Sequence, residues 1–516
     1  MKQLQRLVLL SFFIVYHVFM TAQNWPVIIG DNISTNNSSI IEDYDKGFLL
    51  CNWNHKSPTF THYGWIVKTD INGNILWDKT FGDGNYSMSF SGATRTTNND
   101  VLISGSIGKY DNTYKKDPLF MKLNACGEVE WCTVLHKAGS IGKDYGTGVI
   151  ELPGGGYIGM IKYYGYQIQT IRISLVKLDA HGVPLWVKHL AQEDTTVFNE
   201  EGYELILTSN SNYLVAGHCL CPGRRPYFIM TDEDGEELWS LKWDNQNLHS
   251  GSIEQIIEKD NGVFYASGGG KYGYYTHPAL YKFDAGGNEI YHHLLLGDTL
   301  RGGGAGPLAL INDTTFAIGY NWGTNPNPNY GNSEIATIDT LGNIINKRLL
   351  VEQTLEPANI ITTFDGKIVV TGHYHLDGNW DTYMWKMNKQ LEDDSVNGEI
   401  IAYDTLCPYQ ITSDTTDLTC GVYTNVDIDE IPTKGEYENP LKVFPNPASD
   451  NIQIEVCPGK NQKIRIVDFT GSIVLETTLP ETGKLTVDIS SQLDGIYLMS
   501  LLHKGIYVSS IKLLIK

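Results

Sequence analysis

Seven copies of one short phrase constrain this chain more than any other feature. Each copy begins with an apolar pair, which is usually followed by Lys, one further residue and then Asp or Asn. Gly usually lies three positions after the Asp or Asn, and Trp often lies seven positions after it. A period of this length is typical of an array of supersecondary units. The copies are 49 to 55 residues apart and are marked by Asp70, Asn124, Asp179, Asp232, Asp284, Asp339 and Asn388.

Each copy predicts a β-hairpin, for example WIVKTDINGNILW at 65–77, in which Gly supplies the positive φ of the turn. A second hairpin precedes each copy, with Asn, Asp, Gly or Pro between two short apolar runs. Two hairpins per unit give four strands. We therefore predict an all-β fold with a seven-bladed β-propeller over residues 23–424, in units of about 53 residues. An open solenoid is the alternative, but four strands in about 50 residues fit blades better.

The N-terminus predicts a secretory signal peptide over residues 1–22. Lys2 and Arg6 precede an apolar run from Leu7 to Met20, and small residues follow at Thr21 and Ala22. The run is too short for a good bilayer span, and no later stretch reaches about 18 apolar residues. We expect a mature protein without a transmembrane segment.

Charge marks a boundary near residue 440 and excludes one class of partner. The net charge of −21 repels nucleic acid and anionic membranes. The tail from Leu441 is nearly neutral, with 8 basic and 7 acidic residues. Residues 425–440 are acidic, contain two prolines and predict a linker.

Eight cysteines in an exported chain permit disulfides. Cys407 and Cys420 lie outside the repeats in a Pro/Asp/Thr-rich stretch, so we predict that they bridge one another. Cys126 and Cys132 are too far apart along one hairpin to bond each other, roughly 16 Å at ~3.3 Å per residue. We expect the side chains of these two cysteines to act as small buried residues in the core.

The recurring aromatic residues are expected to pack between blades, since a large aromatic on a strand usually buries area. The series is Trp77, Trp131, Trp186 and Trp239, with Tyr291 and Asn346 at the equivalent places. The phrase resembles the Asp-x-x-x-Gly-x-x-x-Trp hairpins of quinoprotein-type bacterial propellers, with a turn one residue shorter. That resemblance implies a scaffold with an inter-blade aromatic dock. No residues for a quinone are identifiable, so no cofactor is expected.

The loops between the second and third strands of each unit are long and rich in Tyr, Trp, His, Asn and Gly. With strands that alternate in direction, these loops share one face with the connections between units. Aromatic rings beside amides and hydroxyls suit a glycan or protein ligand, although the loops could instead pack on one another. The candidate contacts are Trp53, Tyr110, Tyr164, Tyr274, Trp322, Tyr374 and Trp380.

From Leu441 to Lys516, alternating apolar residues and turn signals predict a small, Ig-like β-sandwich of about seven short strands. This tail resembles the C-terminal sorting domain of type IX (Por) secretion substrates of Bacteroidetes. The resemblance implies recognition by the outer-membrane translocon and a protein that reaches the cell surface or the medium through the periplasm. It rests chiefly on Pro445, Asn446, Pro447, Asp468, Gly471, Gly495, Tyr497 and Lys512.

The sequence shows no nucleophile elbow, His-Glu-x-x-His, P-loop or EF-hand register. His292-His293 and His373-x-His375 lack a carboxylate or Cys at matching spacing, so no metal is expected. We therefore expect a non-catalytic scaffold that binds a ligand or partner. The alternative is an extracellular polysaccharide hydrolase or lyase, which needs two converging carboxylates about 5–10 Å apart.

Overall fold

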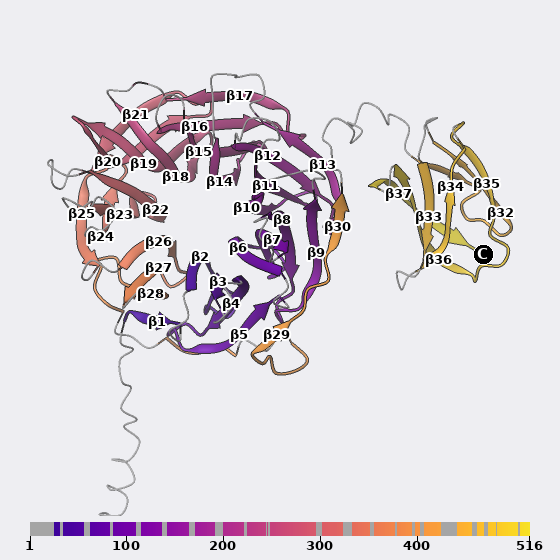
Figure 1. The fold of residues 1–516 in the computed structure, drawn as a ribbon, viewed down its shortest axis with the longest axis horizontal. Helices are drawn as coiled ribbons and strands as arrows, with labels where there is room; N and C mark the ends of the chain where they lie inside the picture. Colours follow the sequence, from indigo (N-terminus) through magenta and orange to yellow (C-terminus); the bar gives the residue numbers. More distant parts are fainter. Residues whose placement is uncertain are drawn as a thin grey trace, which may run out of the picture.

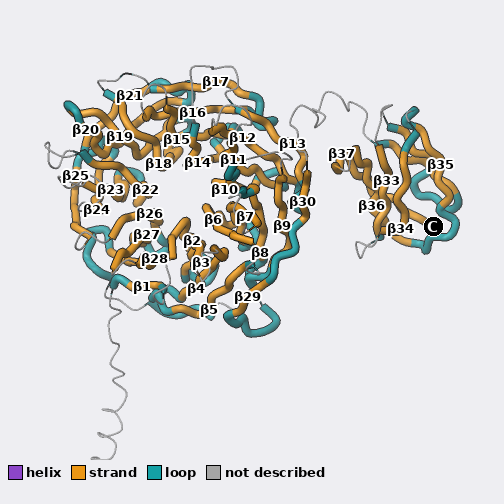
Figure 2. Tube along the Cα trace, in the orientation of Figure 1, coloured by secondary structure: helices purple, strands orange, loops and turns teal. Residues whose placement is uncertain are grey.

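The structure is a computed structural model in which the described part of the chain is β-strand joined by turns and loops, as Figure 2 shows. Within the described residues, no helix is long and apolar enough to cross a membrane. The predicted signal peptide and linker lie outside the described residues. The structure describes residues 25–516 except 31–34, 56–61, 83–85, 110–114, 137–141, 165–170, 191–199, 221–223, 244, 246–247, 296–301, 323–332, 351–354, 377–378, 395–397, 403–406, 425–440, 457–461, 469–472, 481 and 504–505.

Seven sheets are arranged in a ring (Figure 1); each has four antiparallel strands, and two carry a fifth strand at the outer edge that is described below. The first sheet is β2 (Thr35–Glu42), β3 (Phe48–His55), β4 (His62–Thr69) and β5 (Ile75–Phe81); the second is β6 (Tyr86–Arg95), β7 (Val101–Lys109), β8 (Asp117–Leu123) and β9 (Val129–His136); the third is β10 (Tyr145–Glu151), β11 (Tyr157–Tyr164), β12 (Ile171–Leu178) and β13 (Pro184–His189); the fourth is β14 (Glu201–Leu207), β15 (Tyr213–Leu220), β16 (Arg224–Thr231) and β17 (Glu237–Lys242). The fifth is β18 (His249–Asp260), β19 (Val263–Tyr272), β20 (Tyr275–Asp284) and β21 (Glu289–Leu294); the sixth is β22 (Gly303–Asn312), β23 (Thr315–Trp322), β24 (Ser333–Asp339) and β25 (Ile344–Leu350); the seventh is β26 (Leu355–Thr362), β27 (Ile368–Leu376), β28 (Asn379–Met387) and β1 (Val27–Ile29).

The first strand of each sheet lies nearest the centre of the ring, and each contacts the first strand of the next sheet all the way round, from β2 to β26 and back to β2. Buried apolar side chains join neighbouring sheets. Leu214 and Phe228 of the fourth sheet, for example, share one cluster with Phe264 and Tyr281 of the fifth. The predicted seven-bladed propeller is confirmed. Because consecutive strands pair antiparallel, the tight hairpin turns lie on one face of the ring, and the longer loops lie on the other, here called the long-loop face.

The repeated Asp or Asn holds each hairpin turn closed with its side chain. In the third sheet, Asp179 Oδ1 accepts hydrogen bonds from the backbone N–H groups of His181 (2.8 Å) and Val183 (2.9 Å). The same two bonds form at all seven repeated positions. Such side-chain bonds are why Asp and Asn favour turns. The residue three positions on has positive φ in every copy, and Leu391 takes the place of Gly in the last.

The repeated Trp packs against the hairpin glycine of the next sheet, which confirms the predicted docking between blades. A methyl carbon added at Gly182 would lie only 2.3 Å from Trp131 Cε3, and one added at Gly235 only 2.5 Å from the Trp186 ring. Each glycine is therefore required both for its positive φ and for the close approach of an indole.

Gly182→Ala is expected to lower the free energy of unfolding by about 2–4 kcal/mol, because positive φ and an overpacked contact each add a penalty. Gly155→Ala is the matched control, since Gly155 also has positive φ (+87°) but nothing lies within 4 Å of an added methyl group. Chemical denaturation of the two variants measures the difference. Equal losses at the two positions would contradict the docking role of the glycine.

One strand of the ring departs from the predicted chain order. The sequence placed the fourth strand of the seventh unit after Asn388, but that position is occupied by β1 from the N-terminus, which pairs with β28 as Val27↔Met384 to Ile29↔Thr382. Extending this antiparallel register sets Trp25 opposite Lys386, as Trp77 stands opposite Lys68 in the first sheet. Trp25 packs near Gly73 of the first sheet. The residue at the seventh position of the series, Trp25, therefore comes from the N-terminus.

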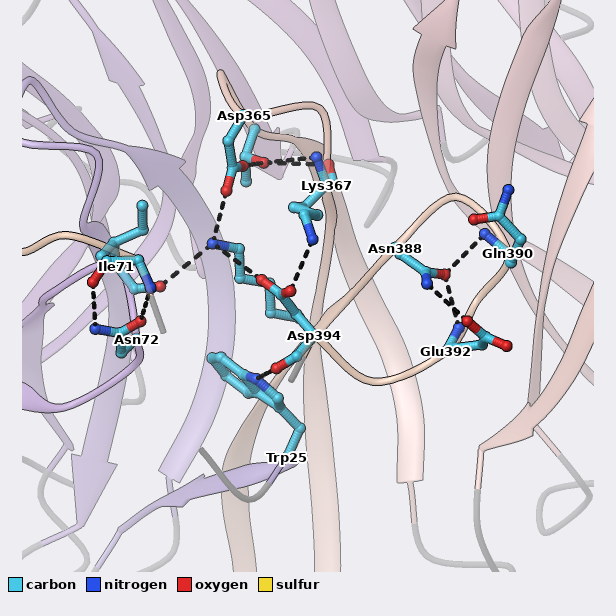
Figure 3. Close-up of polar contacts among 12 residues, drawn as sticks. Trp25, Ile71, Asn72, Asp365, Lys367, Asn388, Gln390, Glu392 and Asp394 are labelled. Atoms are coloured by element: carbon cyan, nitrogen blue, oxygen red, sulfur yellow. Dashed lines mark hydrogen bonds and ion pairs between the residues drawn. The ribbon is translucent and has the colours of Figure 1, made fainter. Parts of the chain in front are cut away.

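A polar cluster holds the junction between the last and first sheets (Figure 3). Trp25 Nε1 donates to the backbone oxygen of Asp394 (3.0 Å), and Lys367 Nζ lies 2.7 Å from Asp394 Oδ1. Lys386 is 2% exposed; its Nζ lies 3.1 Å from Asp365 Oδ2 and 3.5 Å from Asp394 Oδ2. A buried ammonium requires such partners, because an unpaired charge is very unfavourable in the interior.

Residues 407–424, here called the C-terminal extension, run along the outer edges of the first two sheets. Strand β29 (Asp414–Thr416) pairs parallel with β5, and β30 (Gly421–Thr424) pairs parallel with β9. Lys79 Nζ lies 3.0 Å from Asp414 Oδ2. These pairings cover two sheet edges that would otherwise expose unpaired backbone groups.

The predicted bridge between Cys407 and Cys420 is wrong. Cys407 bonds Cys126 and Cys420 bonds Cys132, with Cα–Cα separations of 5.6 and 4.6 Å. Cys126 and Cys132 do not bond each other, as argued from their spacing, but they are not the unbridged buried residues that were expected. The prediction failed because it considered only pairs close in sequence, whereas the extension lies alongside the hairpin formed by β8 and β9.

The C-terminal residues form the predicted β-sandwich. One sheet is β31 (Lys442–Phe444), β32 (Asn451–Glu455) and β35 (Lys484–Asp488); the other is β34 (Ile473–Thr478), β33 (Gln462–Val467), β36 (Gly495–His503) and β37 (Ile506–Ile515). Ile452, Ile464, Met499 and Leu513 are fully buried in their shared core.

Candidate functional site

The described members of the predicted set of aromatic contacts come from several sheets. Trp53 is partly buried and stacks on His62, with ring centroids 4.3 Å apart. Tyr274, in the β19–β20 turn, is 96% exposed. Trp322 is 7% exposed and its Nε1 donates to Glu334 Oε2 (3.2 Å), so little of its ring is accessible to a ligand.

Two of the remaining predicted contacts belong to the seventh sheet. Tyr374 packs against the core of the seventh sheet, and Trp380 meets His373 edge-on at 6.0 Å. Tyr110 and the side chain of Tyr164 lie outside the described residues. Among the aromatic contacts of the described residues, none joins two members of this set. Their role in binding stays a prediction.

A pocket of about 550 Å³ lies where the C-terminal extension meets the second sheet, at its long-loop face. The strand ends of β7, β8 and β9 form part of the wall, and the start of β6 and the extension form the rest. The lining residues are Gly82, Tyr86, Met88, Ile107, Gly108, Lys115, Asp117, Val134, His136, Asp417, Leu418, Thr419, Cys420 and Val422. The volume lies within the range of about 300–1,000 Å³ that is usual for ligand sites.

The pocket combines apolar walls with a small polar group. Asp117 Oδ2 lies 2.9 Å from His136 Nδ1, and the two side chains are 25% and 44% exposed. They project from adjacent strands, β8 and β9, and Lys115 lies two residues before Asp117. Tyr86 is 44% exposed at the rim. In ligand pockets, a small number of polar groups on a largely apolar lining fix the orientation of the ligand.

One wall of the pocket is held covalently, because Cys420 lines the pocket and is bonded to Cys132 of β9. Lys116 lies between the lining residues Lys115 and Asp117 in the chain, and burial and the neighbouring Lys143 lower its pKa to about 8. Its Nζ donates to Ser89 Oγ at 3.3 Å. No sequence pattern indicated this pocket, because the extension forms it with a sheet more than 250 residues earlier in the chain.

Several carboxylates lie at the start of β14, on the inner side of the ring. Burial raises the pKa of Glu200 to about 7, although Arg172 Nη1 lies 2.5 Å from its Oε1. Burial also raises the pKa of Glu204 to about 8. For Glu201, burial opposes a low pKa, but Lys162 Nζ at 2.9 Å and Tyr203 hold the pKa below its usual range. The dense acidic run at 200–204 was the available sequence signal for these residues.

The sorting motif residues support the last strand of the C-terminal domain. Asn446 Nδ2 donates to the backbone oxygen of Lys512 (2.7 Å), and the Leu514 N–H donates to Asn446 Oδ1 (2.9 Å). Tyr497 is 7% exposed, and its hydroxyl donates to the backbone oxygen of Leu493. The described motif residues Pro445, Pro447, Asp468 and Gly495 lie at strand ends or turns, and Gly471 lies outside the described residues.

Comparison with solved structures finds weak likenesses. A protein of unknown function from Bacteroides caccae is 13% identical with a TM-score of 0.32, covering 50% of this chain and 81% of that one. An unknown-function protein from Dyadobacter fermentans is 12% identical (TM-score 0.38; 70% and 97% covered). The acylaminoacyl peptidase of Pyrococcus horikoshii is 8% identical (TM-score 0.40; 82% and 58% covered). Likenesses this weak carry no functional argument.

No curated protein matches the sequence. One family model does match: residues 442–516 correspond to the secretion system C-terminal sorting domain. The match covers the sandwich of β31 to β37 and agrees with the resemblance drawn from the Pro-Asn-Pro motif and the closing strand. The C-terminal domain is thus a type IX secretion sorting domain, recognised by that system, and the protein is one that the system exports to the cell surface or the medium.

Proposed function

We propose that the propeller is a non-catalytic binding scaffold and that the pocket beside the C-terminal extension holds its ligand. The observation that carries this proposal is the pocket itself, about 550 Å³ in volume and walled partly by a segment that two disulfides attach to the second sheet. A site of this kind is already formed before the ligand arrives, so little ordering is needed on binding.

The lining favours an amphipathic ligand such as a short glycan or a peptide end. Met88, Ile107 and Val134 offer apolar contact, while Lys115, Asp117 and His136 offer hydrogen bonds or charge. Tyr86 at the rim can cover an apolar sugar face or a side chain. The net charge of −21 disfavours a polyanionic ligand.

Screening the full mature chain on a glycan and peptide array tests the proposal. With any ligand that binds, Tyr86→Ala and His136→Gln are expected to weaken affinity at least tenfold, because both groups line the pocket. Tyr274→Ala tests the competing site among the predicted aromatic contacts: that residue is 96% exposed and belongs to the fifth sheet, so affinity should not change if the ligand lies in the pocket.

Two results would contradict the proposal. If Tyr274→Ala abolished binding while the pocket variants bound normally, the ligand would bind elsewhere on the long-loop face. If an array glycan were instead released as shorter products, the propeller would be a hydrolase or lyase. Circular dichroism of each variant shows whether the fold is intact.

A further inference from the structure

Two histidines and a glutamate converge within the fifth sheet. Glu289 Oε2 lies 2.6 Å from His249 Nε2, and Glu289 Oε1 lies 2.6 Å from His292 Nδ1. The three candidate ligand atoms all lie within 4.8 Å of one another. His249 is the first residue of β18, the innermost strand, whereas Glu289 and His292 lie on β21, the outermost. The cluster is therefore created by the tertiary structure.

The cluster is mostly buried and partly accessible to solvent. The side chains of His249, His292 and Glu289 are 7%, 15% and 23% exposed. Trp243 and Tyr281 form aromatic walls, with ring centroids 5.5 and 6.1 Å from that of His249. A low-polarity surround strengthens interactions with a bound cation.

The three side chains present their ligand atoms to one another. His249 faces Glu289 through Nε2 and His292 faces it through Nδ1, each at 2.6 Å. The other nitrogen of His249, Nδ1, is buried without a hydrogen-bond partner in the structure and diverges from Glu289, so it is a position for a supporting partner such as a water molecule and not for the ion. Two imidazoles and a carboxylate are also the donor set of many catalytic zinc sites.

We propose that His249, Glu289 and His292 bind a divalent transition-metal ion of the zinc class, a site that goes beyond the proposed ligand-binding function. Imidazole nitrogen favours zinc and its neighbours over Ca²⁺ and Mg²⁺, which prefer oxygen donors. Ligand atoms of a tetrahedral zinc ion lie roughly 3.3 Å apart, so displacements of about 1 Å accommodate the ion. Three protein ligands leave a position open to water.

The sequence offered a different pairing. His292 and His293 are adjacent, but successive side chains on a strand point to opposite faces. His293 lies on the other side, against Gly342 of the sixth sheet; a methyl group added at Gly342 would contact the His293 ring. His249, 43 residues earlier in the chain, replaces His293 as the second imidazole.

The test uses the full mature chain after removal of metals with a chelator. Calorimetric titration with Zn²⁺ is expected to show one site of micromolar or tighter affinity. Glu289→Gln and His292→Gln should each weaken it more than about 100-fold, because even residues that only support metal ligands contribute about 10–100-fold. His293→Gln is the matched control and should bind as the wild type does.

Cobalt substitution provides a readout that does not depend on the variants folding. Co²⁺ added to the metal-free wild type should give the visible absorption of a four- or five-coordinate ion, and Zn²⁺ should displace it. The proposal is overturned if the wild type shows no such absorption and no zinc binding. It is also overturned if Glu289→Gln and His293→Gln bind the metal equally well.

Discussion

Trp25→Ala is expected to lower the free energy of unfolding of the propeller by about 3–5 kcal/mol, the usual cost of removing a buried Trp. The side chain is 9% exposed, packs near Gly73 of the first sheet and donates through Nε1 to Asp394. Removal of the indole leaves a cavity and releases β1 from the junction between the last sheet and the first.

Urea denaturation measures this loss of stability when it is monitored by far-ultraviolet circular dichroism, a signal from the backbone that does not depend on tryptophan. Tyr274→Ala removes an aromatic ring of similar size that is 96% exposed, and it should change stability by less than about 0.5 kcal/mol. A Trp25→Ala variant as stable as that control would show that β1 does not hold the ring together. Deleting residues 23–30 should destabilise the ring further, because the seventh sheet then loses its fourth strand.

Deleting residues 441–516 is expected to leave a folded propeller in the periplasm and almost none at the surface or in the medium. The deletion removes the whole sorting domain, which matches residues 442–516. It keeps the C-terminal extension, which ends at Thr424 and remains bonded through Cys126–Cys407 and Cys132–Cys420. Separate cores generally fold independently when a linker of low apolar content joins them.

Cell fractionation, with protease resistance as the measure of folding, tests this expectation. A second truncation after residue 400 serves as the control, since it removes the extension as well and should yield a less protease-resistant propeller. Efficient appearance of the first truncation in the medium would contradict the sorting role. Its rapid degradation in the periplasm would instead contradict independent folding of the propeller.

The sequence by itself determined the structural features that depend on residues close to one another in the chain. Asp179, Gly182 and Trp186 lie within eight residues, and such spacings specify a hairpin turn, its positive φ and an aromatic dock wherever they recur. Pro445-Asn446-Pro447, in combination with the later turn residues and the closing strand, likewise indicated the sorting domain. These features can be predicted from the sequence because side-chain hydrogen bonds to nearby backbone groups, and the alternation of side chains between the two faces of a strand, are local properties.

Only the tertiary structure decided which distant segments meet. It brought Trp25 to Asp394, Cys407 to Cys126 and His249 to Glu289. The first two pairings follow from closing seven sheets into a ring and laying the extension on its outer edge, and the third follows from the folding of the fifth sheet. No local pattern encodes that geometry, since the position of one sheet relative to another reflects the packing of all of them. The disulfide partners, the pocket and the proposed metal site were therefore beyond the reach of the sequence alone.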